Sequence, residues 1–155
     1  MSGRAKVITV SDGVAAGERD DRSGRAVSEQ LIAAGYDVVE HTVTPDGRAA
    51  VAAALRAAAD GFAGLIVTTG GTGFGPRDET PEGTRLVLDR EAPGLAEAMR
   101  LTNPLGRLSR ATAGSIAQAL VVNVPGSTAG ATECLAAVLD VVPHALELLR
   151  GEHPH

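Results

Sequence analysis

The sequence predicts an α/β fold, a three-layer sandwich in which a mostly parallel sheet is flanked by helices. Unbroken apolar runs, such as Leu65-Ile66-Val67, indicate strands that are covered on both faces, as in a parallel sheet. Segments with helical spacing of apolar residues alternate with these runs, which is the pattern of right-handed strand–helix–strand units. At 155 residues the chain suits one domain, expected over residues 1–151, with residues 152–155 as a frayed tail.

The composition narrows the class of function. The chain has a formal net charge of -5, a pI near 5.3, one Tyr, two Phe and no Trp. Nucleic-acid binding is therefore not expected, because it uses basic surfaces and aromatic stacking. No run reaches the roughly 18 apolar residues of a membrane span and no apolar signal segment opens the chain, so we expect a cytoplasmic protein. Cys134, the single cysteine, lies among apolar residues and predicts a buried, inert thiol.

The first half of the chain predicts two strands, each followed by a helix. The expected strands are Lys6–Ser11 and Tyr36–Thr44, the second of which alternates more and is expected nearer an edge. The expected helices are Ser23–Ala34, with Ser23 as its N-cap, and Arg48–Ala59.

Polar turns follow both strands, at the edge where ligands bind to parallel sheets. Ser11 and Asp12 follow the first strand, and Asp46 lies in the turn Pro45-Asp46-Gly47 after the second. Each turn either contacts a ligand or is only a turn, since Asp-Gly and Pro-Asp-Gly are common turn sequences. The charged segment 17–22 predicts a solvated loop.

Residues 64–84, GLIVTTGGTGFGPRDETPEGT, form the most informative segment. We expect its strand to end at Thr68 or Thr69, and a helix to run over Pro81–Asp89 with Thr80 as its N-cap. Between them lies a glycine cluster, made of Gly70, Gly71, Gly73 and Gly75.

A glycine-rich loop between a strand and a helix has two interpretations. It can present backbone N–H groups to a phosphate, or it can be a tight structural crossover. The spacing matches neither the P-loop nor the dinucleotide-binding motif. Asp78 favours a ligand, because a carboxylate beside a phosphate site would repel that ligand unless a cation lies between them. Asp78 is therefore a candidate magnesium ligand.

The second half of the chain predicts one more clear strand, Leu120–Val124. Helices are expected over Pro93–Leu101 and from about Thr128 to Leu149, the latter with a separate final segment at Pro143. Residues 103–107 predict a turn, and residues 111–117 fit either a short strand or a turn.

Several polar residues of this half have more than one interpretation. Asn123, near the end of its strand, either satisfies a neighbouring backbone group or orients a ligand. Ser109 and Arg110 follow a turn, where a solvent-exposed pair is the usual arrangement. Gly126 and Ser127 repeat the strand, glycine turn and helix arrangement of the central segment, which predicts a second side to the same site.

Four motifs occur in one order along the chain: TTGGTGFGPRDETPEGTR, REAPGLAEAMR, NPLGRLSRATAG and NVPGS. Together they closely resemble the family of molybdenum-cofactor biosynthesis proteins that includes molybdopterin adenylyltransferase. The resemblance runs from Val7 to about Gly151. It implies the molybdopterin-binding fold, a homotrimer, and transfer of AMP from ATP to the terminal phosphate of molybdopterin with release of pyrophosphate.

The resemblance also places the segment 17–22 near the substrate crevice and implies roles for individual residues. Asp46 and Asp78 would be the catalytic pair, holding Mg²⁺ and positioning ATP. A phosphate monoester is mostly dianionic at neutral pH, so this nucleophile needs no general base. The expected nucleotide and phosphate ligands are Ser11, Asp12, Gly70, Gly71, Thr72 and Gly73, and the expected pterin ligands are Ser109, Arg110, Gly126 and Ser127.

Two features depart from the family pattern. Gly83 stands where the family usually has Ala, which is expected to weaken the start of its helix by about 1 kcal/mol. The chain also lacks the fused insertase partner of some relatives, so we expect hand-over to a separate molybdenum insertase. The alternatives are a non-catalytic molybdopterin-binding or carrier protein and an oligomeric scaffold; the presence of both Asp46 and Asp78 favours the enzyme.

Overall fold

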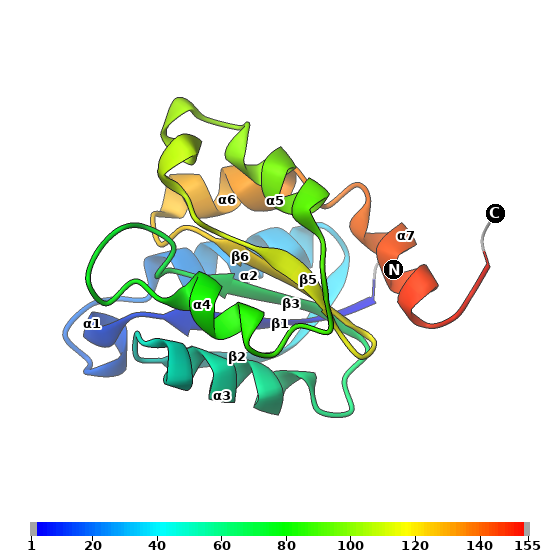
Figure 1. The fold of residues 1–155 in the computed structure, drawn as a ribbon, viewed down its shortest axis with the longest axis horizontal. Helices are drawn as coiled ribbons and strands as arrows, with labels where there is room; N and C mark the ends of the chain where they lie inside the picture. Colours follow the sequence, from blue (N-terminus) through cyan, green and yellow to red (C-terminus); the bar gives the residue numbers. More distant parts are fainter. Residues whose placement is uncertain (1–2, 154–155) are drawn as a thin grey trace.

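A single mixed sheet forms the centre of the computed structural model, which describes residues 3–153 (Figure 1). The strands are β1 (Gly3–Val10), β2 (Tyr36–Thr44), β3 (Gly64–Thr69), β4 (Arg90–Glu91), β5 (Ala113–Ile116) and β6 (Ala119–Val124). Their order is β2-β1-β3-β6-β5-β4. The first four strands in that order are parallel, and β5 pairs antiparallel with both of its neighbours, β6 and β4. The predicted α/β fold with a mostly parallel sheet is thus confirmed.

Helices cover both faces of the sheet. They are α1 (Asp12–Ala15), α2 (Arg22–Ala33), α3 (Arg48–Ala59), α4 (Thr80–Arg85), α5 (Pro93–Arg100), the 3-10 helix η1 (Pro104–Leu108), α6 (Thr128–Ala136) and α7 (Val142–Leu149). One face carries α3 and α4, and the other carries α2, α5, α6 and α7 (Figure 1). No helix within residues 3–153 has the length and apolar character to cross a membrane.

The central strands alternate between two hydrophobic cores. In β3, Leu65 and Val67 pack into the core beneath α2 and α6, whereas Ile66 packs into the core beneath α3. All three side chains are fully buried. This two-sided burial explains why the strand is an unbroken apolar run. The edge strand β2 is mostly exposed, as its alternating sequence predicted.

Some predicted helix ends are wrong. The N-cap of α2 is Asp21 and not Ser23, because the Asp21 carboxylate accepts a hydrogen bond from the Gly24 N–H at 3.1 Å. The helix expected over Pro81–Asp89 is the shorter α4, and it ends early because the Asp89 N–H donates to the Ser115 carbonyl beside β5. The Thr80 hydroxyl does not cap that helix; it donates to the Gly70 carbonyl.

The remaining open assignments are resolved by tertiary contacts. Residues 111–117 contain β5, which pairs with β6. The closing helix is divided into α6 and α7, with Pro143 in the first turn of α7. Gly83 lies where α4 packs on α3, since a Cβ there would come within 2.7 Å of the Arg48 carbonyl oxygen. The last two residues of the predicted tail, 154–155, lie outside the described part of the chain.

Candidate active site

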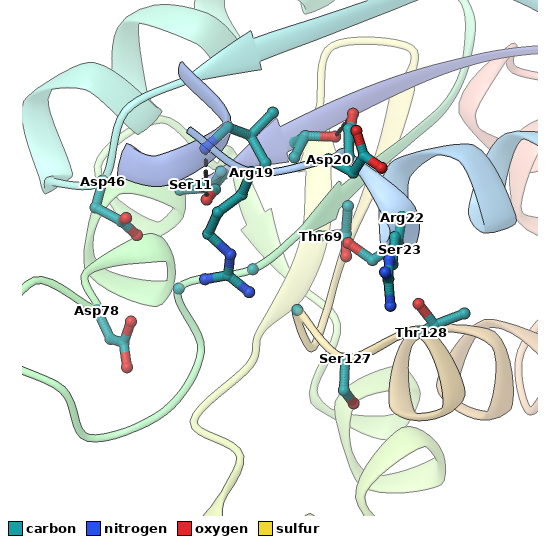
Figure 2. A pocket seen from close by; sticks show the side chains of 17 residues that line it. Ser11, Arg19, Asp20, Arg22, Ser23, Asp46, Thr69, Asp78, Ser127 and Thr128 are labelled. Atoms are coloured by element: carbon teal, nitrogen blue, oxygen red, sulfur yellow. Dashed lines mark hydrogen bonds between the residues drawn. The ribbon is translucent and has the colours of Figure 1, made fainter. Parts of the chain in front are cut away.

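A cavity of about 710 Å³ opens at the carboxyl ends of β1, β3 and β6 (Figure 2). Parallel strands bring these ends to one edge of the sheet, where ligands of open α/β sheets bind. Ser11 from the end of β1, Asp46 from the turn after β2, and Gly70 and Gly71 from the end of β3 line the cavity. Gly126 and Ser127, between β6 and α6, complete it. Segments far apart in the sequence therefore form one site.

The glycine loop is packed tightly at its start. Gly70 has φ +109°, and its N–H donates to the Val124 carbonyl at 3.0 Å. A Cβ at this position would collide with the Val10 carbonyl oxygen. The loop is also tied to α4, because the Thr80 hydroxyl donates to the Gly70 carbonyl at 2.8 Å. The glycine therefore allows the loop to pass between the ends of β1 and β6.

Asp46 is held by the segment that follows β1. Its carboxylate accepts a hydrogen bond from the Asp12 N–H at 2.9 Å, and its own N–H donates to the Asp12 carboxylate at 3.0 Å. Arg77 donates to both Asp12 carboxylate oxygens at 3.1 Å and to the Asp46 carbonyl at 3.0 Å. Asp12 thus positions Asp46 and does not line the cavity itself.

The two carboxyl groups differ in their electrostatic environment. The hydrogen bond from Arg77 lowers the pKa of Asp12. Burial raises the pKa of Asp46, and the negative charges of Asp12 and Asp78 add to that rise. The Asp46 carboxylate therefore faces both a low-polarity environment and like charge, which a bound cation would relieve.

Asp46 and Asp78 fit the requirements of a magnesium ion. Both line the cavity, and the Asp78 side chain is fixed by the Gly75 N–H at 2.9 Å. Within residues 3–153, no group of three or more His, Cys, Asp or Glu side chains forms a metal cage. Mg²⁺ does not need one, because it commonly uses one or two carboxylates together with water and substrate phosphates.

A second cavity, of about 560 Å³, adjoins the first. The two share Gly71, Asp78, Gly126 and Ser127. The second cavity also contains Thr72, Gly73 and Ser109 of the predicted ligands, together with apolar side chains such as Leu105 and Leu108. The first cavity is rich in charged groups, so the two cavities differ in chemical character. They meet at Asp78.

Arg110 lines neither of these cavities. Its guanidinium donates to the Gly73 carbonyl at 2.8 Å and to the Asp78 carbonyl at 2.7 Å, and it forms an ion pair with Glu82. It also lies 5.6 Å from the centre of the Phe74 ring. In this structure Arg110 holds the glycine loop against α4, and the pterin contact predicted for it stays a prediction.

Sequence reasoning missed two arginines of the site. Arg19 and Arg22 line the first cavity. Residues 17–22 themselves favoured a solvated loop, and the family resemblance placed only the segment as a whole near the crevice. The alternating charges of this loop gave no reason to select either residue. Their position becomes visible only when the loop between α1 and α2 is placed over the ends of the strands (Figure 2).

Comparison with known proteins gives consistent matches over almost the whole chain. A family model described as "Probable molybdopterin binding domain" matches residues 6–144. A molybdopterin adenylyltransferase of Helicobacter pylori strain J99 is 35% identical over 154 residues, covering 95% of this chain and 88% of that protein. A second, from Escherichia coli K12, is 32% identical over 169 residues, covering 97% and 87%.

Solved structures agree with these matches. The molybdopterin biosynthesis enzyme MoaB of Thermus thermophilus superposes with a TM-score of 0.90 at 46% identity, covering 96% of this chain and 97% of that one. A molybdopterin biosynthesis protein of Mycobacterium abscessus gives a TM-score of 0.91 at 36% identity, covering 97% and 98%. This chain also matches 47% of the length of a molybdenum cofactor biosynthesis bifunctional protein of Synechococcus elongatus, at 36% identity.

Proposed function

The chain belongs to the family described as a probable molybdopterin binding domain, and we propose that it is a molybdopterin adenylyltransferase. In this role it would transfer AMP from ATP to the terminal phosphate of molybdopterin during molybdenum cofactor biosynthesis. The observation that carries the proposal is the pair of adjoining cavities that share Gly71 and Asp78. The charged cavity, lined by four aspartates and two arginines, would suit a polyphosphate once Mg²⁺ offsets its excess of negative charge, and the more apolar one suits a ring system.

The reaction requires an oxygen of the molybdopterin phosphate to bond to the α-phosphorus of ATP. The bond from that phosphorus to the bridging oxygen breaks, and pyrophosphate leaves with the electron pair. Both reactants are anionic, so the site must relieve repulsion and align them. The shared boundary of the two cavities is where the phosphate of one substrate would meet the α-phosphate of the other.

We assign a part in that arrangement to residues at this boundary and to Asp46, which lines the first cavity. Asp46 and Asp78 would hold Mg²⁺, which when bound would neutralise phosphate charge and orient the phosphates. Gly71, Thr72 and Gly73 would donate backbone N–H groups to the phosphates, whereas the N–H of Gly70 is already bonded to the Val124 carbonyl. Ser127 lies at the boundary as the N-cap of α6, with its hydroxyl accepting from the Gly130 N–H at 3.2 Å.

The test is to incubate the protein with molybdopterin, ATP and magnesium and to detect adenylylated molybdopterin by liquid chromatography and mass spectrometry. Asp78→Asn should reduce product formation strongly, because it removes a carboxylate from the shared boundary. Asp37→Asn is the matched control, since it makes the same charge change on the exposed face of β2. Equal product from wild type and Asp78→Asn would contradict the proposed role of Asp78.

A non-catalytic molybdopterin carrier of the same fold is the second candidate. It would bind molybdopterin and release it unchanged in the same experiment. The convergence of Asp46 and Asp78 on one cavity favours the transferase, because a carrier has no need of two carboxylates facing a nucleotide site.

We also propose that the protein acts in the cytoplasm as a homotrimer and passes its product to a separate molybdenum insertase. The exposed apolar side chains of Leu101 (84%), Leu105 (72%) and Leu108 (58%) support self-association, because together they offer an apolar surface near η1. Light scattering of the purified protein tests the trimer. Transfer of the adenylylated product to an added insertase tests the hand-over.

A further inference from the structure

The side chain of Arg19 extends into the charged cavity. Figure 2 shows it reaching into the space that Asp46 and Asp78 border. Within residues 3–153 its guanidinium has no hydrogen bond or ion pair. Arg19 is solvent-exposed, and its guanidinium lies in a cavity with four aspartates without pairing with any of them.

The aspartates of the cavity are already engaged elsewhere. Asp20 pairs with Arg25 at 4.0 Å, and Asp21 pairs with His41 at 2.9 Å. Asp46 and Asp78 accept hydrogen bonds from backbone N–H groups. The guanidinium of Arg19 is therefore available to an anionic ligand, and such a ligand would gain up to five N–H donors in a fixed planar array.

The direction of the Arg19 side chain is set by a glycine. A Cβ at Gly13 would lie 2.6 Å from Cδ and 3.0 Å from Cγ of Arg19, so the stem of the arginine occupies the space that a larger residue would fill. The φ angle of Gly13 is not left-handed, so the backbone of α1 does not itself require glycine. The absence of a side chain at Gly13 thus leaves the space in which the stem of Arg19 packs.

The loop that carries Arg19 is anchored at both ends. The Glu18 N–H donates to the Gly13 carbonyl at 2.9 Å, immediately beside the arginine. At the other end, Asp21 caps α2 and accepts a hydrogen bond from the Thr9 hydroxyl at 2.8 Å. The backbone that carries Arg19 is therefore fixed beside the cavity before any ligand binds, which reduces the entropy lost on binding.

We propose that Arg19 is a further catalytic residue, which binds the polyphosphate of the nucleotide and stabilises the negative charge that develops when pyrophosphate leaves. This inference rests on the proposed adenylyl transfer. As the new P–O bond forms and the bond to the bridging oxygen breaks, the electron pair passes to the pyrophosphate. N–H groups of Arg19 would donate to the phosphate oxygens on which this charge develops.

The kinetic test compares four variants by their rates of adenylylated product formation. Arg19→Ala should lower kcat by about 10²–10³-fold, as expected for the loss of one preorganised donor to a developing charge. Arg19→Lys should retain part of the activity, because it keeps the charge and loses the planar fork. Gly13→Ala should lower kcat by about tenfold or more with an unchanged melting temperature, because it displaces the arginine stem. Arg56→Ala, on the exposed side of α3, is the charge-matched control and should match the wild type.

The proposal would be overturned if kcat and KM of Arg19→Ala both equal those of the wild type. If the wild type forms no adenylylated product, the proposed function fails, and calorimetric titration decides the Arg19 site separately. Arg19→Ala should then bind ATP and inorganic pyrophosphate at least tenfold more weakly in the presence of magnesium, with unchanged affinity for adenosine. Equal affinities for all three probes would overturn the Arg19 site.

Discussion

Asp12 and Asp46 exchange hydrogen bonds, the backbone N–H of each donating to the carboxylate of the other at 2.9 and 3.0 Å. This pair joins the segment after β1 to the turn after β2, which are 34 positions apart in the chain. Arg77 neutralises Asp12 and also donates to the Asp46 carbonyl. The carboxylate of Asp46 is thereby fixed in the cavity by backbone groups and by one arginine, before any cation or substrate binds.

Replacing Asp46 with Asn should raise stability at neutral pH while it abolishes most activity. Folding raises the pKa of Asp46, chiefly by burial, so its ionisation destabilises the folded state. The stability that protonated Asp46 contributes is fully present below the pKa of this group in the unfolded chain. It is lost as the pH rises through the pKa of Asp46 in the folded protein. We expect a melting temperature higher by about 1–3 °C at pH 7, in line with interactions of about 1 kcal/mol or less. Product formation should fall by about 100-fold or more.

Calorimetry at several pH values checks this prediction. The difference in melting temperature between Asp46→Asn and the wild type should vanish below about pH 4, where unfolded aspartate is itself protonated. A variant that is less stable than the wild type at pH 7 would show that the ionised form of Asp46 is favoured by folding, contrary to the prediction.

Replacing Arg77 with Ala should make the enzyme more sensitive to acid. The positive charge of Arg77 lowers the pKa of Asp46 and so opposes the rise caused by burial. Without it, Asp46 takes up a proton at higher pH. The acidic limb of the rate profile should shift upward, with a greater loss of activity at about pH 6 than at about pH 8. Arg85→Ala removes an arginine paired with Glu91, outside both cavities, and should leave the profile unchanged.

Asn123 should be essential for stability. Its side-chain amide donates to the hydroxyls of Thr68 at 2.8 Å and Thr84 at 3.1 Å, and its oxygen accepts from the Thr112 N–H at 3.1 Å. Asn123, Thr68 and Thr84 are fully buried. Asn123→Ala removes all three bonds and leaves the Thr112 N–H without this acceptor, although the Thr84 hydroxyl keeps its bond to the Thr80 carbonyl. We expect the free energy of unfolding to fall by about 2–4 kcal/mol.

Urea unfolding tests this prediction, with a lower midpoint at an unchanged m-value as the expected result. Asn103→Ala is a suitable comparison, because Asn103 is exposed and caps only the short helix η1. That substitution should cost about 1 kcal/mol or less. Similar losses for the two variants would mean that the buried network contributes no more than an exposed cap.

Replacing Gly83 with Ala should destabilise the protein, although alanine favours helix formation by about 1 kcal/mol. A Cβ at Gly83 would lie 2.7 Å from the Arg48 carbonyl oxygen and 2.7 Å from Cβ of Val51. Overpacking between α3 and α4 should outweigh the propensity gain and leave a net loss of about 1–2 kcal/mol. The same change at Gly94 in α5, where nothing lies within 4 Å, should stabilise by up to about 1 kcal/mol. Equal gains in the urea midpoint at both sites would refute the packing argument.

The elements with strong local signals could be predicted from the sequence. The strand at Leu65-Ile66-Val67 is apolar because two cores cover it, and that requirement is visible in the residues themselves. The helix Arg48–Ala59 and the edge strand Tyr36–Thr44 have the predicted bounds. The helix expected over Pro81–Asp89 ends at Arg85, because its end is set by pairing with β5, which local propensity does not describe.

Some residues of the candidate site could likewise be selected from the sequence, and others could not. The glycine loop and Asp78 could be selected from the residues themselves, because turns after parallel strands meet at one edge of a sheet, whereas Asp46 was selected by the family resemblance. The roles of Asp12, Arg19 and Arg110 could not, because each depends on a partner or a cavity far away in the chain. Arg110, for example, is directed at the glycine loop by carbonyl groups more than 30 positions away.

The α/β class, the parallel strands, the glycine loop and Asp78 could be inferred from local chemistry and periodicity, and Asp46 from the resemblance of the sequence to a known family. Three relationships depend on the folded chain. Asp12 is hydrogen-bonded to Asp46, the stem of Arg19 packs against Gly13, and two cavities meet at Asp78. These relationships depend on the fold because their contacts join residues that are separated in the sequence. Residue order constrains such contacts only after the sheet has brought its strand ends together.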